Sequence, residues 1–287
     1  MRRWSLLAAL VWQAAGACAA APGERILVAV DEWPRAVKPL VYANALGGHW
    51  DGAWHPPEAC GRRLRPGLEG PLISLTEGVV GRYRVVAVEP PSTDPPDEGT
   101  IYARGEITLD GRKPFRYPLL ALLGATADPS WRVTSYSLTH KTYLALARAF
   151  LTANGVSAAS AARLHLRQLL ATELERDGRR EVLTAFSSSA GDYILPPLER
   201  KGDFWGLTLR YVPRGSANAR TRPFFLQVIR SDETVPEQTL VVGILDVNGD
   251  GTAEIVTRSA YYEGWAYQLW QWKGGKLTVV SSWGAGV

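Results

Sequence analysis

The chain has 287 residues, of which 46% are hydrophobic, and it contains 28 glycines, 19 prolines and 11 tryptophans. This length suits one large or two small domains, and the composition favours β-strands joined by many turns. The net charge is +4, which falls to +2 without the two arginines nearest the N-terminus (32 − 2 = 30 basic against 28 acidic residues). Because no dense run of lysine or arginine occurs either, the sequence argues against a nucleic-acid partner.

Residues 1–19 have the order of an export signal. Arg2 and Arg3 precede an apolar stretch that ends at Ala15, and small residues follow at 17–19. A buried N-terminal helix is the alternative, but the order of charge, apolar stretch and small residues favours a signal peptide. The apolar stretch is too short to span a bilayer, and no later run is long enough. We therefore expect a periplasmic or secreted protein without a transmembrane segment.

The two cysteines, Cys18 and Cys60, bear on the same question. Cleavage after Ala19 leaves Cys60 alone, so no intrachain disulfide can form. Cleavage before Cys18 would instead make that residue a lipid-modified N-terminus, because residues 15–18 resemble a bacterial lipobox with Ala in place of the usual Leu. A lipoprotein anchored through Cys18 is thus the second hypothesis. Both hypotheses place the protein outside the cytoplasm, where calcium is plentiful.

Residues 20–135 predict an N-terminal β region. Short apolar runs alternate here with glycine-containing turns. Asp110-Gly111 is a favoured hairpin turn, so the strands on either side of it are predicted to pair with each other. The strand candidates are residues 26–30, 39–46, 72–75, 83–88, 100–109 and 115–123.

One central helix is expected around residues 143–151, on the evidence of an apolar stripe at helical spacing. Ser137 or Thr139 can cap its start, and Asn154-Gly155 supplies a left-handed stop. The stripe is most simply a packing face against a sheet. Its members are Tyr143, Leu144, Ala147, Phe150 and Leu151.

Residues 157–176 fit two patterns. Their leucine content favours a second helix, whereas the alternation of Arg163, His165 and Arg167 with leucines favours a half-buried strand. An internal match decides for the strand. Residues 173–181 align with residues 246–254, and the acids, the Asp-Gly pair and the following apolar dipeptide all coincide. We therefore predict that a strand–loop–strand unit occurs twice.

The last third of the chain predicts a succession of strands, at residues 204–212, 223–230, 239–245, 254–259, 266–272 and 276–282. The predicted fold is mainly β with one central α-helix. It comprises an N-terminal β region and, over residues 136–287, a helix followed by a β-hairpin or propeller-blade-like region.

The strongest chemical signal is the loop of residues 246–254, here called the cation loop. Oxygen-bearing groups occupy alternate positions, and Gly249 and Gly251 tolerate the positive φ that a tight curl requires. Such a set suits a hard cation, Ca²⁺ above all. The five positions are Asp246, Asn248, Asp250, Thr252 through its backbone carbonyl, and Glu254.

The surroundings of the loop favour a β-hairpin over an EF-hand. An EF-hand needs an acid at its twelfth position and then a helix, whereas here Thr257 lies in a predicted strand. The cation loop instead resembles the calcium loops of FG-GAP and VCBS repeats, which occur in integrin α-subunit propellers and in many exported bacterial proteins. That resemblance implies structural Ca²⁺ on the five positions named above, with Glu254 where Asp is commoner. The Phe-Gly and Gly-Ala-Pro elements of the family are not evident.

The alternative is an Asn-Gly-Asp-Gly turn with solvated acids and no ion. Three close carboxylates would then repel one another, and a divalent cation would relieve that repulsion. The matching loop of residues 173–181, here called the twin loop, is expected to have lost its ion. Arg176, Arg179 and Arg180 are expected to neutralise its acids instead.

Three other groups of residues favour simple packing. Residues 49–55 hold two histidines but too few ligands for a transition metal, so a turn with packed tryptophans is favoured. Trp265, Trp270 and Trp272 could form an exposed row for sugar rings, but a core position is favoured. Cys60 is next to two arginines, which is a weak signal for a nucleophile.

No catalytic residue is assigned, because nucleophile-elbow, zinc-protease, phosphate-loop and dinucleotide motifs do not occur. We expect an exported, calcium-binding, non-enzymatic protein of the cell envelope that binds or scaffolds a protein or glycan ligand. The alternatives are a carbohydrate-binding surface module that uses exposed Trp and Tyr, and a hydrolase whose site is assembled only in space.

Overall fold

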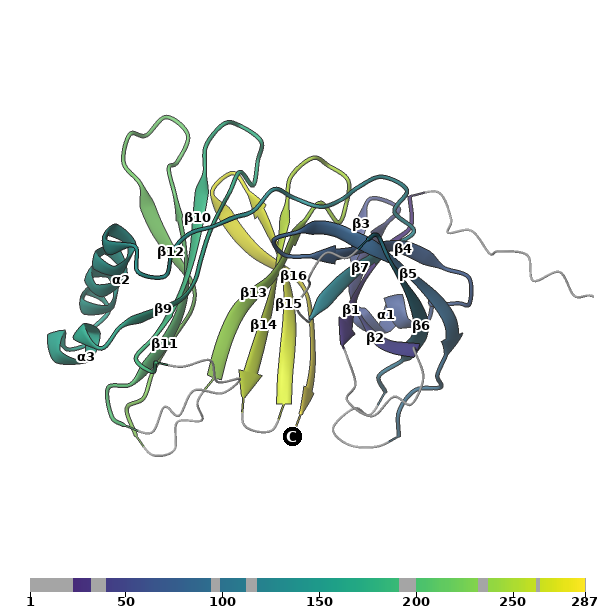
Figure 1. The fold of residues 1–287 in the computed structure, drawn as a ribbon, viewed down its shortest axis with the longest axis horizontal. Coiled ribbons are helices and arrows are strands. Elements are labelled where there is room, and N and C mark those ends of the chain that lie inside the picture. Colours follow the sequence, from purple (N-terminus) through teal and green to yellow (C-terminus); the bar gives the residue numbers. More distant parts are fainter. Residues whose placement is uncertain are drawn as a thin grey trace, which may run out of the picture.

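The computed structural model describes residues 23–31, 40–93, 99–111, 118–190, 200–231, 237–261 and 264–286. The predicted signal peptide, including Cys18, lies outside these ranges. The molecule is mainly β, as predicted, and its parts stack in four layers: a helical layer, a five-stranded sheet, a four-stranded sheet and a β-barrel (Figure 1).

The N-terminal β region is a closed six-stranded barrel. Its strand order is β1-β7-β4-β5-β6-β2, and β1 also pairs with β2, which closes the ring. A short β3 extends β2 as a hairpin, and the five-residue helix α1 (Pro57–Gly61) follows. The strands are β1 (Arg25–Asp31), β2 (Leu40–Trp50), β3 (Ala53–His55), β4 (Glu69–Ser74), β5 (Gly78–Val88), β6 (Tyr102–Leu109) and β7 (Leu119–Leu123).

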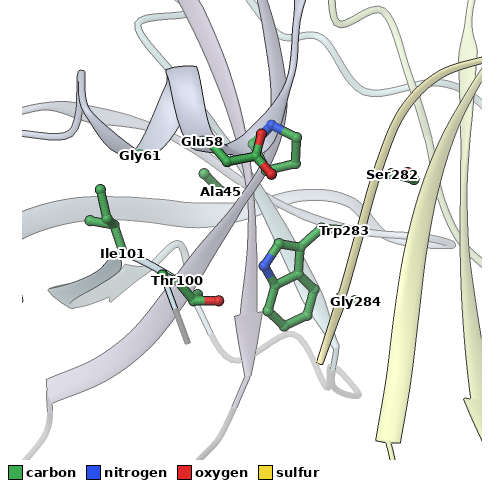
Figure 2. Close-up of a pocket in the computed structure, with 10 residues that line it drawn as sticks. Ala45, Glu58, Gly61, Thr100, Ile101, Ser282, Trp283 and Gly284 are labelled. Carbon is green, nitrogen blue, oxygen red and sulfur yellow. The ribbon is translucent and has the colours of Figure 1, made fainter. Parts of the chain in front are cut away.

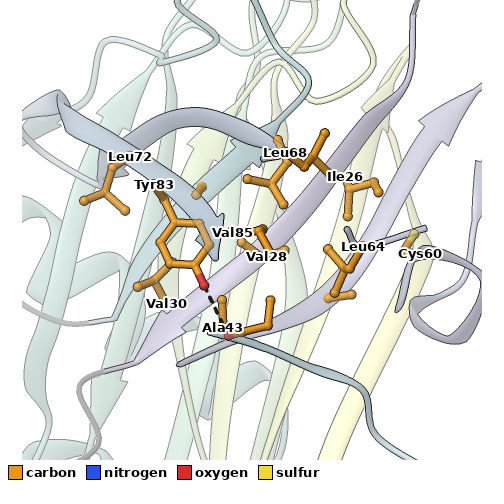
Figure 3. Packing of buried hydrophobic residues seen from close by; sticks show 14 of the residues in the cluster. Ile26, Val28, Val30, Ala43, Cys60, Leu64, Leu68, Leu72, Tyr83 and Val85 are labelled. Atoms are coloured by element: carbon orange, nitrogen blue, oxygen red, sulfur yellow. Dashed lines mark hydrogen bonds between the residues drawn. The ribbon is translucent and has the colours of Figure 1, made fainter. Parts of the chain in front are cut away.

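The side chains of β1 alternate between two buried faces of this strand. Ile26, Val28 and Val30 point into the barrel core, whereas Leu27 and Ala29 face the neighbouring four-stranded sheet. The barrel core also contains Tyr83, whose hydroxyl donates a hydrogen bond of 3.2 Å to the Ala103 carbonyl (Figure 3). Both faces of β1 are therefore apolar, which is why its sequence reads as a continuous hydrophobic run.

The predicted hairpin at Asp110-Gly111 is wrong. β6 pairs with β5 and β2, whereas β7 lies between β1 and β4. All five residues of β7 are buried, in two alternating sets that face the barrel core and the four-stranded sheet. Because β6 is half-exposed and β7 must be covered on both sides, the two strands take different places in the barrel.

The C-terminal strands form two antiparallel meanders, in agreement with the predicted propeller-blade-like region. The five-stranded sheet has the order β12-β11-β10-β9-β8, and the four-stranded sheet has the order β13-β14-β15-β16. The strands are β8 (Thr134–Ser135), β9 (His165–Thr172), β10 (Glu181–Ser187), β11 (Phe204–Tyr211), β12 (Arg220–Val228), β13 (Glu237–Leu245), β14 (Glu254–Tyr261), β15 (Gly264–Lys273) and β16 (Lys276–Gly286).

The predicted helix is α2 (Lys141–Ala153), which packs its apolar stripe on the five-stranded sheet. Asn154 ends it and Gly155 follows with φ of 83°, as expected. The predicted caps are wrong: no side chain caps the start, and the Ser137 hydroxyl accepts a hydrogen bond from the Thr139 N–H, before the helix begins. Residues 157–176, which fit both a helix and a strand pattern, contain the five-residue helix α3 (Ala158–Ala162) and then the strand β9.

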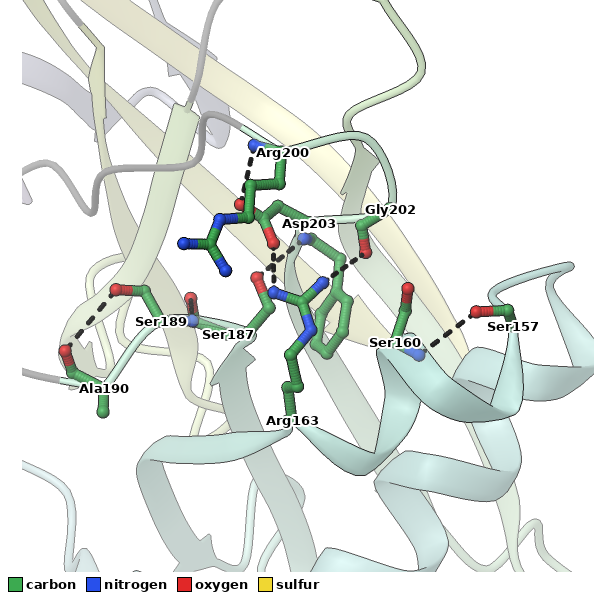
Figure 4. A network of polar contacts seen from close by, with 11 residues as sticks. Ser157, Ser160, Arg163, Ser187, Ser189, Ala190, Arg200, Gly202 and Asp203 are labelled. Carbon is green, nitrogen blue, oxygen red and sulfur yellow. Dashed lines mark hydrogen bonds and ion pairs between the residues drawn. The ribbon is translucent and has the colours of Figure 1, made fainter.

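An ion pair fixes α3 to the sheet. Arg163, directly after α3, donates to Asp203, whose other oxygen accepts from the Arg200 N–H at 3.0 Å (Figure 4). Burial tends to raise the pKa of Asp203, but these hydrogen bonds and the nearby guanidinium lower it below its usual value. The carboxylate is therefore held charged beneath the helix.

In the four-stranded sheet, β13 and β14 are largely buried on both faces because they lie between the other two β layers. Ile255 packs with residues of the five-stranded sheet, and the adjacent Val256 packs with residues of the barrel. β14 thus carries the core of both interfaces. Whatever fixes the start of β14 also fixes how the layers meet.

Replacing Gly70 by alanine is expected to destabilise the barrel, because the added Cβ would lie 1.9 Å from the Leu122 carbonyl oxygen. The free energy of unfolding, measured by chemical denaturation, should fall by about 1–3 kcal/mol. Gly284→Ala is the control, since its Cβ would only make an ordinary 3.4 Å contact with Ala266. A Gly70→Ala midpoint equal to wild type would contradict the packing of β4 on β7.

Candidate metal centre

The cation loop connects β13 to β14, and the Asp246 carboxylate organises it. One oxygen of Asp246 accepts a hydrogen bond from the Gly249 N–H at 2.6 Å, and the other accepts from the Gly251 N–H at 3.0 Å. Both glycines have positive φ, 80° and 83°. The glycines therefore serve the predicted purpose of curling the backbone around an acid.

The next positions form the outer rim of the loop. The Asn248 side-chain oxygen accepts from the Asp250 N–H at 2.9 Å, and Asp250 Oδ1 accepts from the Thr252 N–H at 2.8 Å. The Asn248 amide also donates to Asp250 Oδ2 at 3.1 Å. Each oxygen that accepts one hydrogen bond keeps a further lone pair, so these contacts and a cation are compatible.

Glu254 is the buried member of the set. It begins β14, has 0% exposure, and accepts a hydrogen bond from the Val247 N–H at 2.9 Å through Oε2. Its Oε1 is buried without a hydrogen-bond partner. Burial raises the pKa of Glu254 to about 8, and Asp250 and Asp246 raise it further, against the lowering effects of the backbone N–H groups of Val247 and Asn248. A buried carboxylate with an unsatisfied oxygen is costly unless a proton or a cation compensates it.

The five predicted ligands thus belong to one loop, but the structure does not bring its three carboxylates together as a metal-binding group. No group of three His, Cys, Asp or Glu side chains in the described part of the chain is arranged to hold a metal ion. The reason is local, because the carboxylates of Asp246 and Asp250 both turn toward backbone N–H groups of the loop.

The twin loop joins β9 to β10 and has positive φ at the same two positions. Arg176 and Gly178 have positive φ, 49° and 79°, at the positions that correspond to Gly249 and Gly251. The Leu174 N–H donates to Glu181 Oε2 at 2.9 Å, as the Val247 N–H does to Glu254. The predicted strand–loop–strand unit therefore occurs twice, with positive φ at the same two loop positions and the same hydrogen bond to a buried glutamate.

The acids of the twin loop have protein partners. Glu175 accepts from the Gly274 N–H at 3.0 Å, and both Glu175 and Asp177 lie 3.8 Å from the Arg214 guanidinium. Arg179 also lies 4.0 Å from Asp177. Arginine thus neutralises these acids, as expected, although Arg214 was not among the predicted partners.

The other two arginines expected to neutralise the twin loop do not do so. The Arg176 guanidinium lies over the Trp131 ring, 4.2 Å from its centroid. Among the described residues, neither Arg176 nor Arg180 forms an ion pair with a carboxylate. Arg176 thus combines a left-handed backbone conformation with a contact to the tryptophan in place of the expected ion pair.

The two loops lie side by side where all three β layers meet. The Ala253 N–H donates to the Leu174 carbonyl at 2.9 Å, which joins the cation loop to the twin loop. The Asp246 N–H donates to the Pro129 carbonyl at 2.9 Å. From the barrel, Arg25 donates to the carbonyls of Asp246 at 3.5 Å and Val247 at 3.4 Å. The cation loop therefore contacts every layer except the helices.

The histidine candidates form a packed turn. Asp51 and Gly52 make the two-residue connection between β2 and β3, and the rings of Trp50 and His55 stack with centroids 3.6 Å apart. Arg63 lies 4.4 Å from the Trp50 centroid. These contacts agree with the favoured interpretation of packed tryptophans.

The other aromatic and cysteine candidates are also structural. Trp272 is 2% exposed, and Trp270 packs on Phe224 while it donates to the Thr257 hydroxyl. No aromatic side chain is among the large exposed hydrophobics of the described residues. Burial raises the pKa of Cys60 to about 12, so this thiol is a poor nucleophile.

Sequence reasoning missed a cavity of about 230 Å³ between the barrel and the last strand. Glu58 of α1, Thr100 and Trp283 of β16 line it, and the Trp283 ring borders it (Figure 2). The lining comes from four segments that are separate in the sequence, so no local pattern could have found it.

Comparison with protein-family models, curated proteins and solved structures finds no match to this chain. The likeness to FG-GAP and VCBS loops is consequently a likeness of loop residues alone. No helix among the described residues is long and apolar enough to cross a membrane.

The two buried glutamates predict how stability depends on pH without metal. Burial raises the pKa of Glu254 to about 8 and that of Glu181 to about 7, from a usual value of 4.5. Between pH 4.5 and these raised values, the folded state holds protons that the unfolded state releases. The contribution of the two glutamates to stability is therefore greatest below about pH 4.5. It should fall as pH rises to about 8, by on the order of 1 kcal/mol or more per glutamate.

Thermal melts in EDTA between pH 5 and 8 measure this effect. The Glu181→Gln/Glu254→Gln double variant keeps an acceptor for each backbone N–H but cannot ionise, so its melting temperature should vary less across this range. A double variant with the same pH dependence as wild type would show that other groups dominate.

Proposed function

We propose that this is an exported, non-enzymatic protein of the cell envelope whose cation loop binds one structural Ca²⁺, and that the stabilised fold binds or scaffolds a protein or glycan ligand. The observation that carries the proposal is the buried Oε1 of Glu254, which has no hydrogen-bond partner. A hard divalent cation is a partner that suits a carboxylate oxygen of this kind.

The charges around the loop favour a cation over a protein partner. Asp246, Asp250 and Glu254 lie within one short loop, and none of them forms an ion pair in the part of the chain that the structure describes. The nearby Arg25 donates to backbone carbonyls instead. The ligand set would be the four side chains and the Thr252 carbonyl that the sequence suggests.

The twin loop supplies an internal comparison. It has the same curl and the same buried glutamate, yet Arg214 and Arg179 neutralise its exposed acids. In the twin loop, arginines thus offset the repulsion between carboxylates. In the cation loop, a bound cation would have the same effect.

A structural effect of the ion follows from the position of the loop. The loop contacts the barrel, both sheets and the segment before β8, so fixing it would stabilise how the layers meet. A ligand that binds only the folded state adds RT ln(1 + [Ca²⁺]/Kd), roughly 1–3 kcal/mol at tens to hundreds of times Kd.

The alternatives have less support. A carbohydrate-binding module needs an exposed aromatic row, whereas Trp272 is buried and Trp265 and Trp270 are half-buried between layers. A hydrolase has no specific observation in its favour. The export hypothesis rests on the order of residues 1–19, and the envelope location is proposed on that basis.

Calcium binding is tested by calorimetry and by thermal melts with calcium or EDTA. The variant is Asp250→Ala and the matched control is Asp177→Ala, at the equivalent position of the twin loop. Both aspartates accept a hydrogen bond from the N–H two residues later, at 2.8 Å and 3.1 Å, so both variants lose the same structural contact.

Wild type and Asp177→Ala should bind one calcium ion and melt at a higher temperature with calcium. Asp250→Ala should lose at least tenfold in affinity and most of that stabilisation. The proposal fails if wild type gives no binding heat and equal melting temperatures in calcium and EDTA.

A further inference from the structure

The twin loop borders a cavity of about 400 Å³ that is separate from the cation loop. Its lining comes from the segment before β8, from the end of β9 and from the twin loop itself. These segments meet because Thr134 of β8 pairs with Ala171 of β9. The hydroxyl-bearing and charged residues of the lining are Ser130, Arg132, Thr134, Thr172, Glu173, Arg176 and Arg180.

The cavity carries an excess of positive charge. Arg132, Arg176 and Arg180 line it together with one carboxylate, that of Glu173. In the described part of the chain none of these arginines has a carboxylate within ion-pair distance, although other surface arginines do, such as Arg82 with Glu69 at 2.8 Å. Three guanidinium groups against one acid leave a formal charge of about +2, which a dianion would balance.

The backbone gives a second, independent observation. Arg176 has a φ of 49°, a left-handed conformation that disfavours any residue with a Cβ, and the cation loop has Gly249 at the equivalent position. The same comparison places Arg180 where the cation loop has Ala253. A glycine at position 176 would relieve this backbone strain, but the chain has an arginine there. A strained residue of this kind is typical of a functional position.

Trp131 fixes the wall of the cavity and limits what can enter. The indole is 7% exposed, its Nε1 donates to the Glu173 carbonyl, and the Arg176 guanidinium covers its ring at 4.2 Å. Because the ring face is already covered, the cavity does not offer a stacking platform for a base or a sugar. The donors available to a ligand are guanidinium N–H groups and hydroxyls, which suit tetrahedral oxyanions.

We propose that this cavity, formed by Arg132, Arg176 and Arg180, is a binding site for a phosphate or sulfate dianion, either free or as the monoester of a small molecule. The two loops would thus have diverged from one backbone plan, one toward a cation and the other toward an anion. The anion site does not depend on the proposed calcium site, because its residues and its charge are separate.

Calorimetry in EDTA tests the site, with inorganic phosphate, sulfate and glycerol 1-phosphate as probes at constant ionic strength. EDTA removes the case in which an anion binds through calcium. Wild type should bind each dianion saturably, whereas acetate at the same concentration should give no measurable binding. The relative affinities of phosphate and glycerol 1-phosphate then tell whether the free ion or a monoester is preferred.

Three variants locate the binding. Arg132→Gln and Arg180→Gln should each weaken dianion binding about tenfold, since each removes charge-assisted hydrogen bonds. Arg176→Gly should weaken it similarly while the melting temperature stays equal or rises, because glycine accepts the left-handed backbone. Arg82→Gln removes the same charge from the barrel surface, and its affinity should equal that of wild type.

Three results would overturn the proposal. The first is the absence of saturable dianion binding by wild type, or equal binding of acetate. The second is an equal loss of affinity in Arg82→Gln, which would indicate only bulk charge. The third is an Arg176→Gly variant with a lower melting temperature and unchanged affinity, which would mean that Arg176 only covers Trp131.

Discussion

Two buried carboxylates determine how this molecule is built. Glu181 and Glu254 each begin a central strand, and each accepts a hydrogen bond of 2.9 Å from a backbone N–H in the loop that precedes it. A buried acid without a hydrogen-bond donor carries a large desolvation cost. Each loop must therefore place one backbone N–H, that of Leu174 or Val247, within hydrogen-bond distance of its glutamate. This requirement fixes the curl of both loops and the position at which β10 and β14 start.

The consequences extend to the contacts between layers. Directly after Glu254, the two faces of β14 enter different cores, with Ile255 in the core shared with the five-stranded sheet and Val256 in the core shared with the barrel. A shift of one residue would exchange these two sets and remove both interfaces. The loop geometry at one end of the strand is therefore coupled to the packing of the whole four-layer stack (Figure 1).

The sequence predicts the C-terminal strands well because each is bounded by turn residues such as Gly274-Gly275, and because meander strands pair with their neighbours in the chain. It also predicts the repeated loop, since the Asp-Gly pair and the glutamate stand at fixed spacing. It fails at Asp110-Gly111, where barrel closure sends β7 between β1 and β4. The cavity formed by Arg132, Arg176 and Arg180 was missed because its lining comes from separate segments. Its local signal was Arg176, which stands in the twin loop where the cation loop has Gly249.

The most direct test of this account is a crystal structure of the protein grown with calcium, with anomalous difference density used to locate ions. The account predicts one calcium peak, within contact of Glu254 Oε1, Asp246 and Asp250, and no calcium peak at Glu181. It also predicts that the hydrogen bonds from the Val247 N–H to Glu254 and from the Leu174 N–H to Glu181 are retained. A calcium peak in the twin loop, or no calcium in either loop at saturating concentration, would contradict it.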